Sequence, residues 1–255
     1  GVLTLDVSNA ASPEIVDQVP ASAVCGIDFD GTYIYAAGAT GLLVIDPDAI
    51  GGAEIIGTAT ATNALDVCVV GNWVYVTDHN TNLYSVDVTD PYSPVRYDPV
   101  TSGSYGYGID EQDGLLYVAS YYQPRVFDLS VPSAPVELAV FGGNGAYEID
   151  AIGDRLYVTY WGGSRFSIYS LTDPTNPTFV GYWQSNTGSG GADIVWVNSH
   201  IYFGTNDHHI EVVNVDDWTA PYEVGQVSTD GPDGMDTDGL FIYSAENAAG
   251  LKVIL

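Results

Sequence analysis

Short runs of alternating apolar and polar residues return along the whole chain. The clearest run is Gly41–Pro47, which reads GLLVIDP. Altered copies begin at Gly1, Asn82, Pro124, Arg165, His209 and Gly250. Alternation with a period of two predicts β-strands, and the Gly, Asn, Asp and Pro residues between the runs predict tight turns. No stretch keeps a helical period, so the sequence predicts an all-β protein.

A recurring tyrosine sets the period of the repeat. The six tyrosines are Tyr35, Tyr75, Tyr117, Tyr157, Tyr202 and Tyr243. They are spaced by about 40 to 45 residues, which is the period of a four-stranded propeller blade. The predicted repeats cover residues 1–40, 41–80, 81–122, 123–163, 164–207 and 208–249, with a closing strand at 250–255. The sequence therefore predicts one domain over residues 1–255, a six-bladed β-propeller of four-stranded antiparallel blades.

The second repeat shows all four strands of a blade. They are expected at Ala64–Val70, Trp73–Thr77, Leu83–Val88 and Pro94–Asp98. In most repeats the third strand ends in a short polar residue whose side chain can accept a hydrogen bond from the backbone two residues on. These residues are Asp6, Asp46, Asp87, Asp128, Ser170 and Asn214. A proline then opens the fourth strand, the outer edge of the blade, at Pro13, Pro94, Pro135, Pro177 and Pro221.

The tract GLLVIDP, the turn DVTDPYSP from Asp87 and the strand GLLYVA from Gly114 resemble the LVIVD-repeat family. The resemblance covers nearly the whole chain, although the copies IYSL and VVNV depart from it. It implies a secreted or surface-exposed propeller-like protein of bacteria or archaea. It implies no catalytic residues, because the family has no general catalytic signature.

The strand count leaves one copy over. Along the chain, strands follow one another in the order third, fourth, first and second position of a blade. This order occurs six times, and one more third-position strand follows at the end. The chain therefore has twenty-five predicted strands, whereas six four-stranded blades need twenty-four. We expect the strand near Pro13 to join the strands near Gly234 and Tyr243 in the closing blade. Two strands, Gly1–Val7 and Gly250–Leu255, could fill the one remaining position of that blade. The surplus strand either extends the closing blade of its own molecule or pairs with a neighbouring copy. The pairing residues would be Gly1, Val2, Leu3, Leu5, Gly250, Leu251, Val253 and Leu255.

The net charge of the chain limits the classes of molecule that it can bind. The chain has 33 acidic and 5 basic residues, a formal net charge of -28. Nucleic acid and anionic membrane surfaces would be repelled. No apolar run reaches the ~18 residues of a membrane helix, so membrane insertion is not expected. We expect a mature, secreted chain located outside the cell or at its surface.

Acidic residues also gather at two positions of the innermost strand, seven and nine residues before each repeat tyrosine. They are Asp28, Asp66, Asp110, Glu148, Asp150, Asp193 and Asp236. Because innermost strands converge on a propeller axis, a carboxylate-lined channel is predicted. Crowded carboxylates need water, raised pKa values or a cation, and Ca²⁺ accepts many oxygen ligands in loose geometry. A water-filled polar channel without a specific ion is the alternative.

Aromatic residues collect in the loops expected at one end of the propeller. They are Tyr105, Tyr107, Tyr121, Tyr122, Tyr160, Trp161 and Trp183, with His79 and the glycine-rich runs Gly142–Gly145 and Gly188–Gly191. Such a face suits glycans or proteins, whereas packing between loop tips is the structural alternative.

Cys25 and Cys68 are expected to be buried free thiols, with a disulfide as the alternative.

Three functions fit these features. The first is a non-catalytic extracellular structural protein that assembles with itself into a homo-oligomer or homopolymer, such as a filament or surface array. The second is a surface module that binds glycans or proteins through the aromatic loops. The third is a Ca²⁺-dependent hydrolase or lactonase that uses the acidic channel, although no Ser-His-Asp or paired-histidine spacing is legible.

Overall fold

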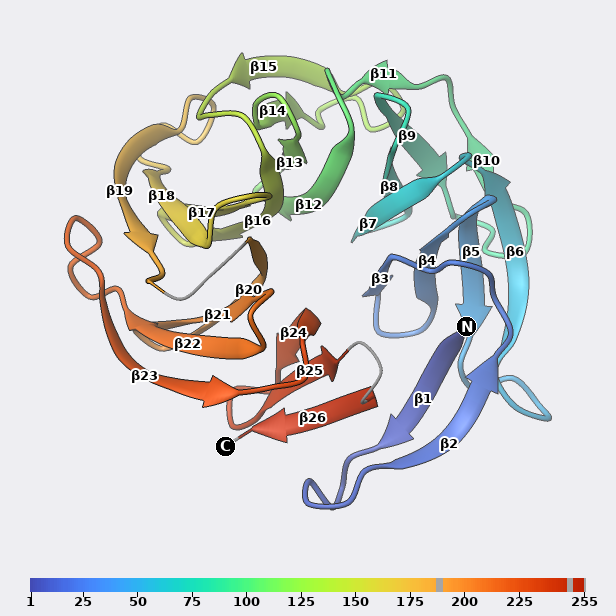
Figure 1. The fold of residues 1–255 in the computed structure, drawn as a ribbon. Helices are drawn as coiled ribbons and strands as arrows, with labels where there is room; N and C mark the ends of the chain where they lie inside the picture. The colour runs from blue at the N-terminus through green and yellow to red at the C-terminus, as the bar shows by residue number, and fades with distance from the viewer. Residues whose placement is uncertain (187–189, 247–249, 255) are drawn as a thin grey trace. The chain divides into compact units, whose positions relative to one another are not determined.

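The computed structural model describes residues 1–186, 190–246 and 250–254. Within these residues every regular element is a β-strand, as the alternating pattern predicts. The chain divides into two compact units, unit 1 over Gly1–Val140 and unit 2 over Phe141–Leu255. Figure 1 shows the strands of each unit arranged as successive antiparallel sheets. Among the described residues there is no helix long and apolar enough to span a bilayer.

Unit 1 contains three four-position sheets, which we call blades, and a hairpin. The hairpin joins β1 (Val2–Asp6) to β2 (Glu14–Val19). The first blade contains β3 (Gly26–Phe29), β4 (Ile34–Gly38), β5 (Gly41–Asp46) and β6 (Glu54–Thr60). The second contains β7 (Ala64–Val70), β8 (Trp73–Asp78), β9 (Asn82–Asp87), β10 (Val95–Arg96) and β11 (Val100–Thr101). The third contains β12 (Gly106–Gln112), β13 (Leu115–Ser120), β14 (Arg125–Asp128) and β15 (Val136–Val140).

Unit 2 contains two complete blades and a three-stranded sheet. The first of these blades contains β16 (Ala146–Ile152), β17 (Arg155–Tyr160), β18 (Arg165–Ser170) and β19 (Thr178–Gln184). The second contains β20 (Gly191–Val197), β21 (His200–Thr205), β22 (His209–Asn214) and β23 (Tyr222–Ser228). The three-stranded sheet contains β24 (Pro232–Thr237), β25 (Ile242–Glu246) and β26 (Gly250–Ile254).

The terminal strands reproduce the predicted surplus. β10 and β11 both pair with β9, so they form one interrupted fourth strand and the 26 strands of the described chain fill 25 positions. β26 takes the third position beside β25, while the fourth-type strand β2 pairs with β1 in a sheet of its own. The two terminal sheets together hold five strands, one more than the four positions of a complete blade. Leu255, one of the predicted pairing residues, lies outside the described residues.

The predicted hydrogen bonds that close the turns after the third-position strands are present at all six predicted residues. The side chain at the end of each third-type strand accepts a hydrogen bond from the N–H two residues on, at 2.7–3.2 Å. The acceptors are Asp6, Asp46, Asp87, Asp128, Ser170 and Asn214. A fourth-type strand begins immediately after each of the five repeat prolines. These local bonds close the turns without help from distant parts of the chain.

The core of each unit lies between its blades. Four apolar residues of the inner strands are buried, namely Val67, Ile109, Ile149 and Ile194. The equivalent Met235 is partly buried, whereas Ile27 on β3 is 56% exposed. The outer strands leave room for the next blade at glycines. A Cβ at Gly57 would collide with the carbonyl oxygen of Pro91 in the following blade.

Candidate functional site

Three of the inner-strand acids fasten one blade to the next. Asp28 on β3 accepts a hydrogen bond from the Val69 N–H of β7 at 2.7 Å. Asp193 on β20 accepts one from the Met235 N–H of β24 at 2.5 Å. Asp66 on β7 accepts one from the Ile109 N–H of β12 at 3.2 Å. A carboxylate that accepts backbone N–H bonds across a blade boundary stabilises packing of the two inner strands.

Three more of the inner-strand acids accept hydrogen bonds from the backbone of their own strand. Asp110 and Asp236 each accept a hydrogen bond from the N–H of the following residue at 2.7 Å, and Glu148 does so at 3.0 Å. Asp150 lies opposite Tyr157 of β17 and is partly buried. Within the described chain, no group of three or more His, Cys, Asp or Glu residues is placed to hold a metal ion. The calcium channel thus stays a prediction, and the carboxylates have a structural explanation that the sequence did not reveal.

Asp193 is the inner-strand acid with a clear electrostatic perturbation. Burial, and to a smaller extent the neighbouring Asp236, raise its pKa to about 7. The N–H groups of Met235 and Ile194 oppose this shift because they favour the charged carboxylate. A carboxyl of this kind changes charge near neutral pH, unlike an exposed aspartate.

Five of the eight predicted face residues form a ring cluster in unit 1, which we call the aromatic cluster. It contains His79, Tyr105, Tyr107, Tyr121 and Tyr122. The His79 ring is stacked on the Tyr105 ring, with centroids 4.0 Å apart and planes 5° from parallel. The cluster joins the loop after β8 to the loops on either side of β12 and β13. Its outer rings are exposed, so it offers an aromatic surface as well as a loop contact.

The remaining three face residues, all in unit 2, do not join one surface. Trp161 is exposed beside Tyr147, with ring centroids 5.3 Å apart. Tyr160 is buried, and its hydroxyl lies 2.9 Å from that of Tyr169. Trp183 is partly buried and donates its indole N–H to Glu211 at 2.9 Å. Of the glycine-rich run at Gly188–Gly191, residues 188 and 189 lie outside the described residues.

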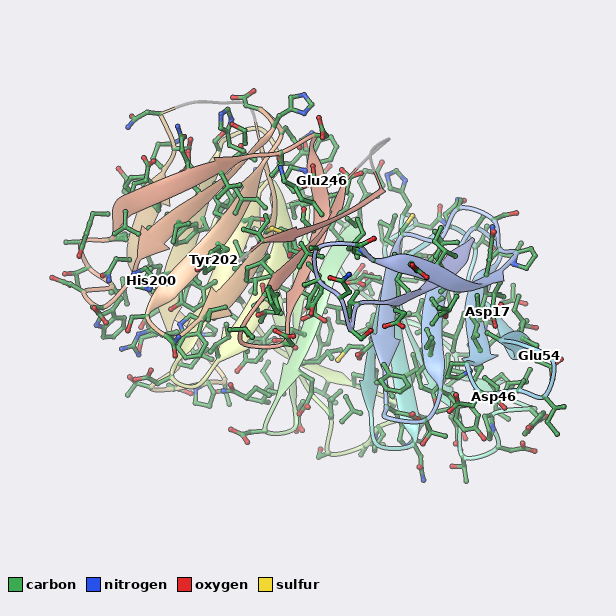
Figure 2. The ribbon with its side chains drawn as sticks, turned by 90° about the horizontal axis from the view of Figure 1, so that it is seen from below. Asp17, Asp46, Glu54, His200, Tyr202 and Glu246 are labelled. Atoms are coloured by element: carbon green, nitrogen blue, oxygen red, sulfur yellow. The ribbon has the colours of Figure 1, made fainter. Side chains whose placement is uncertain are left out.

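The β1–β2 hairpin is attached firmly to the first blade. Val2 and Val19 are buried against Ala36 and Ile45. Asp17 of β2 accepts a hydrogen bond from the Ala53 N–H at 2.5 Å, next to the start of β6. Figure 2 labels Asp17 with Asp46 and Glu54, an opposed pair on β5 and β6, in this part of unit 1. The hairpin is therefore a half-blade held in place, with β1 hydrogen-bonded to another strand on one side only in the described chain.

β26 is also an edge strand. It pairs with β25 along its whole length, from Gly250 opposite Glu246 to Ile254 opposite Ile242. Its other edge is paired with no further strand in the part of the chain that the structure describes. The Lys252 ammonium donates to the Ser228 carbonyl oxygen at 2.5 Å, which ties the strand to the end of β23. The two ends of the chain thus carry similar edge strands.

The cysteines are both free thiols, but only one is buried. Cys68 is buried in the second blade, and burial followed by repulsion from Asp110 raises its thiol pKa well above the usual range. Cys25 is exposed, which corrects the expectation that both would be buried. It precedes β3 rather than lying inside that strand.

One cavity in unit 2 was missed by the sequence reasoning. It has a volume of about 550 Å³ and lies over β18 and β19. It is lined by Gly142, Gly143, Tyr160, Arg165, Ser167, Tyr169, Pro177, Phe179 and Tyr182. Phe179 and Tyr182 are three residues apart, so strict alternation would place them on opposite faces. A register shift in β19 brings both to the same face, and no sequence signal marks that bulge.

No family model matches the chain, and no curated protein matches it. Solved structures do. A protein from Lactobacillus plantarum has a TM-score of 0.84 at 16% identity, covering 97% of this chain and 84% of that one. A proposed 6-phosphogluconolactonase from Bacteroides fragilis has a TM-score of 0.78 at 11% identity, covering 95% and 82%. A functionally unknown protein from Desulfotomaculum acetoxidans has a TM-score of 0.71 at 13% identity, covering 88% and 78%.

These similarities and the sheet topology define the class of the protein. The chain is an all-β protein of the six-bladed β-propeller class, with four-stranded antiparallel blades. The identities are low, so the likeness extends to the fold alone. One neighbour is described as a lactonase and another as functionally unknown, and neither description fixes an activity for this chain.

Proposed function

We propose that this protein is a non-catalytic extracellular structural protein that assembles with itself by strand pairing between its ends. The observation that carries the proposal is the pair of terminal edge strands. β1 and β26 are copies of the same repeat segment, and each is hydrogen-bonded to a strand on one side only in the described chain. An open edge of backbone N–H and C=O groups is a template for another chain.

The pairing would be head to tail. A donor copy presents the half-blade β1–β2, and an acceptor copy presents the sheet β24–β26. Because the two surfaces differ, the contact leaves a free end of each kind on every added copy, and a filament or array follows. The anchoring of the hairpin by Val2 and Asp17 supports this scheme, since a rigid edge loses less entropy on pairing.

The test compares proline variants of adjacent strand residues. Neighbouring residues in a strand direct their N–H groups to opposite edges, so of Leu3→Pro and Thr4→Pro one disturbs the β1–β2 pairing and the other only the open edge. We expect the full chain to form polymers in negative-stain images and light scattering. One variant should remain monomeric with an unchanged melting temperature. A wild-type chain that stays a monodisperse monomer at high concentration, with both terminal strands protected from hydrogen exchange, would refute the proposal.

The aromatic cluster favours a second role, as a surface that contacts glycans or proteins. Its support is the stacked pair of His79 and Tyr105 within five rings, three of which are large exposed tyrosines. Aromatic faces bind the apolar faces of sugars, and their hydroxyls contribute hydrogen bonds. Tyr121→Ala should lower the signal on a glycan array or in a pull-down, while Tyr92→Ala, an exposed tyrosine in a turn, should not.

A Ca²⁺-dependent lactonase remains the enzymatic alternative, suggested by the lactonase description of one structural neighbour. It predicts ester or lactone turnover that is lost with EDTA and with Asp110→Asn. Under the non-catalytic proposal, turnover should be absent before either treatment.

A further inference from the structure

The cavity over β18 and β19 is built from side chains that share one face of the blade. Arg165 and Ser167 lie opposite Gln184 and Tyr182, and Tyr169 lies opposite Phe179. The intervening residues Phe166 and Ile168 point the other way and are buried in the core of unit 2. The cavity face is therefore held rigidly by packing behind it.

Among the described residues, Arg165 is the only charged one that lines this cavity. Its guanidinium carbon lies 4.5 Å from the centre of the Tyr160 ring, a cation–π contact that fixes the side chain without neutralising it. In the described chain the ion pairs involve Arg125 and Arg155 instead. In a protein with 33 acidic residues, a cavity with a cation and no carboxylate is a local exception.

The tyrosines around Arg165 supply hydrogen-bonding hydroxyl groups. The hydroxyls of Tyr160 and Tyr169 lie 2.9 Å apart, and both residues are buried. Burial, and then the neighbouring Tyr160, raise the pKa of Tyr169, so its phenol does not offer a competing negative charge to Arg165. Two flat rings complete the cavity on the solvent side, Phe179 at 58% and Tyr182 at 54% exposure.

We propose that this cavity binds a ligand with one carboxylate on a hydroxylated ring, the chemistry of a uronic acid residue. The single guanidinium matches one carboxylate by a forked, charge-assisted hydrogen bond. The exposed rings of Phe179 and Tyr182 would stack on the C–H face of the sugar. The Ser167 hydroxyl and the backbone at Gly142 and Gly143 border the space left for ring hydroxyls.

The charge and the volume of the cavity both limit which anions it can bind. A phosphate dianion would bring a second charge that no second cation in the cavity offsets, and the net charge of -28 would oppose it further. A volume of about 550 Å³ lies within the usual range for small-molecule pockets, about 300–1,000 Å³. This site is independent of the terminal strands, so it stands or falls separately from the assembly proposal.

The test titrates the full chain with glucuronate or galacturonate, followed by calorimetry or by NMR shifts of the cavity residues. The matched neutral probes are glucose and galactose, and the anion probes without a ring are acetate and phosphate. We expect the uronates to bind at least about tenfold more tightly than every other probe. Added salt should weaken the binding.

Variants separate the two parts of the site. Arg165→Gln should lower uronate affinity by about tenfold or more, and Phe179→Ala should lower it without removing the salt dependence. The control is Arg155→Gln, because Arg155 stacks on Trp218 outside the cavity and should not affect uronate binding. Circular dichroism confirms that each variant is folded. Equal binding of neutral sugars or simple anions, the absence of uronate binding by the folded wild-type chain, or unchanged affinity in folded Arg165→Gln would each overturn the proposal.

Discussion

Replacing Asp28 by alanine tests whether the inner-strand carboxylates fasten the blades. Asp28 accepts two backbone hydrogen bonds at 2.7 Å, one from Phe29 on its own strand and one from Val69 on the next blade. Alanine removes both acceptors and leaves the Val69 N–H without its partner from the neighbouring blade. The best comparison is Asp236, which also lies opposite its repeat tyrosine. Within the described residues, its one backbone hydrogen bond comes from Thr237 on its own strand.

The expected loss follows from the kind of bond. A hydrogen bond to a charged group contributes about 1.5–3 kcal/mol, and partial exposure lets water replace some of it, so we expect about 1–2 kcal/mol for Asp28→Ala. For a chain of this size that corresponds to a fall of about 2–8 °C in melting temperature. Asp236→Ala, at an exposed position, should change stability by no more than about 0.5 kcal/mol. Asp28→Asn should be intermediate, because an amide retains one acceptor oxygen.

Thermal and urea unfolding followed by circular dichroism measure the loss of stability. Native-state hydrogen exchange then locates it, since the Val69 amide should exchange faster in Asp28→Ala while amides of unit 2 should not change. Equal losses in Asp28→Ala and Asp236→Ala, or a Val69 amide that keeps its protection, would show that the bond between blades contributes nothing.

Two further predictions concern titration and reactivity. The folded-state pKa of Asp193, about 7, lies above the value of 3.8 for a free aspartate, so its contribution to stability is present below about pH 4 and is lost as the pH rises through 7. Asp193→Asn cannot ionise, so its melting temperature should rise relative to wild type between about pH 5 and pH 8, and a constant difference would contradict this. A thiol reagent should modify one cysteine, Cys25, in the folded protein and both after unfolding, because Cys68 is buried and its thiolate is disfavoured.

The features that could be predicted from the sequence are those encoded locally. The spacing of the repeat tyrosines fixes the blade, and the bonds from Asp87 to Thr89 and from Asp128 to Ser130 follow from residues two apart. The inner-strand acids were found from the sequence, but their bonds between blades were not, since the partner of Asp28 is 41 residues away and only the packed blades bring it near. The cavity around Arg165 escaped notice because it depends on a bulge in β19, which changes the face of Phe179 without changing the pattern of residue types.

The turn aspartates account for part of the chain's negative charge. Hydrogen bonds from the following residues hold the pKa values of Asp6, Asp87 and Asp217 below their usual range, so these carboxylates stabilise the turns more when they are ionised. This part of the negative charge is then a by-product of closing short turns. Lysine or asparagine substitutions intended to reduce the charge should therefore avoid the turns, and strong acid should weaken the turns that an aspartate closes.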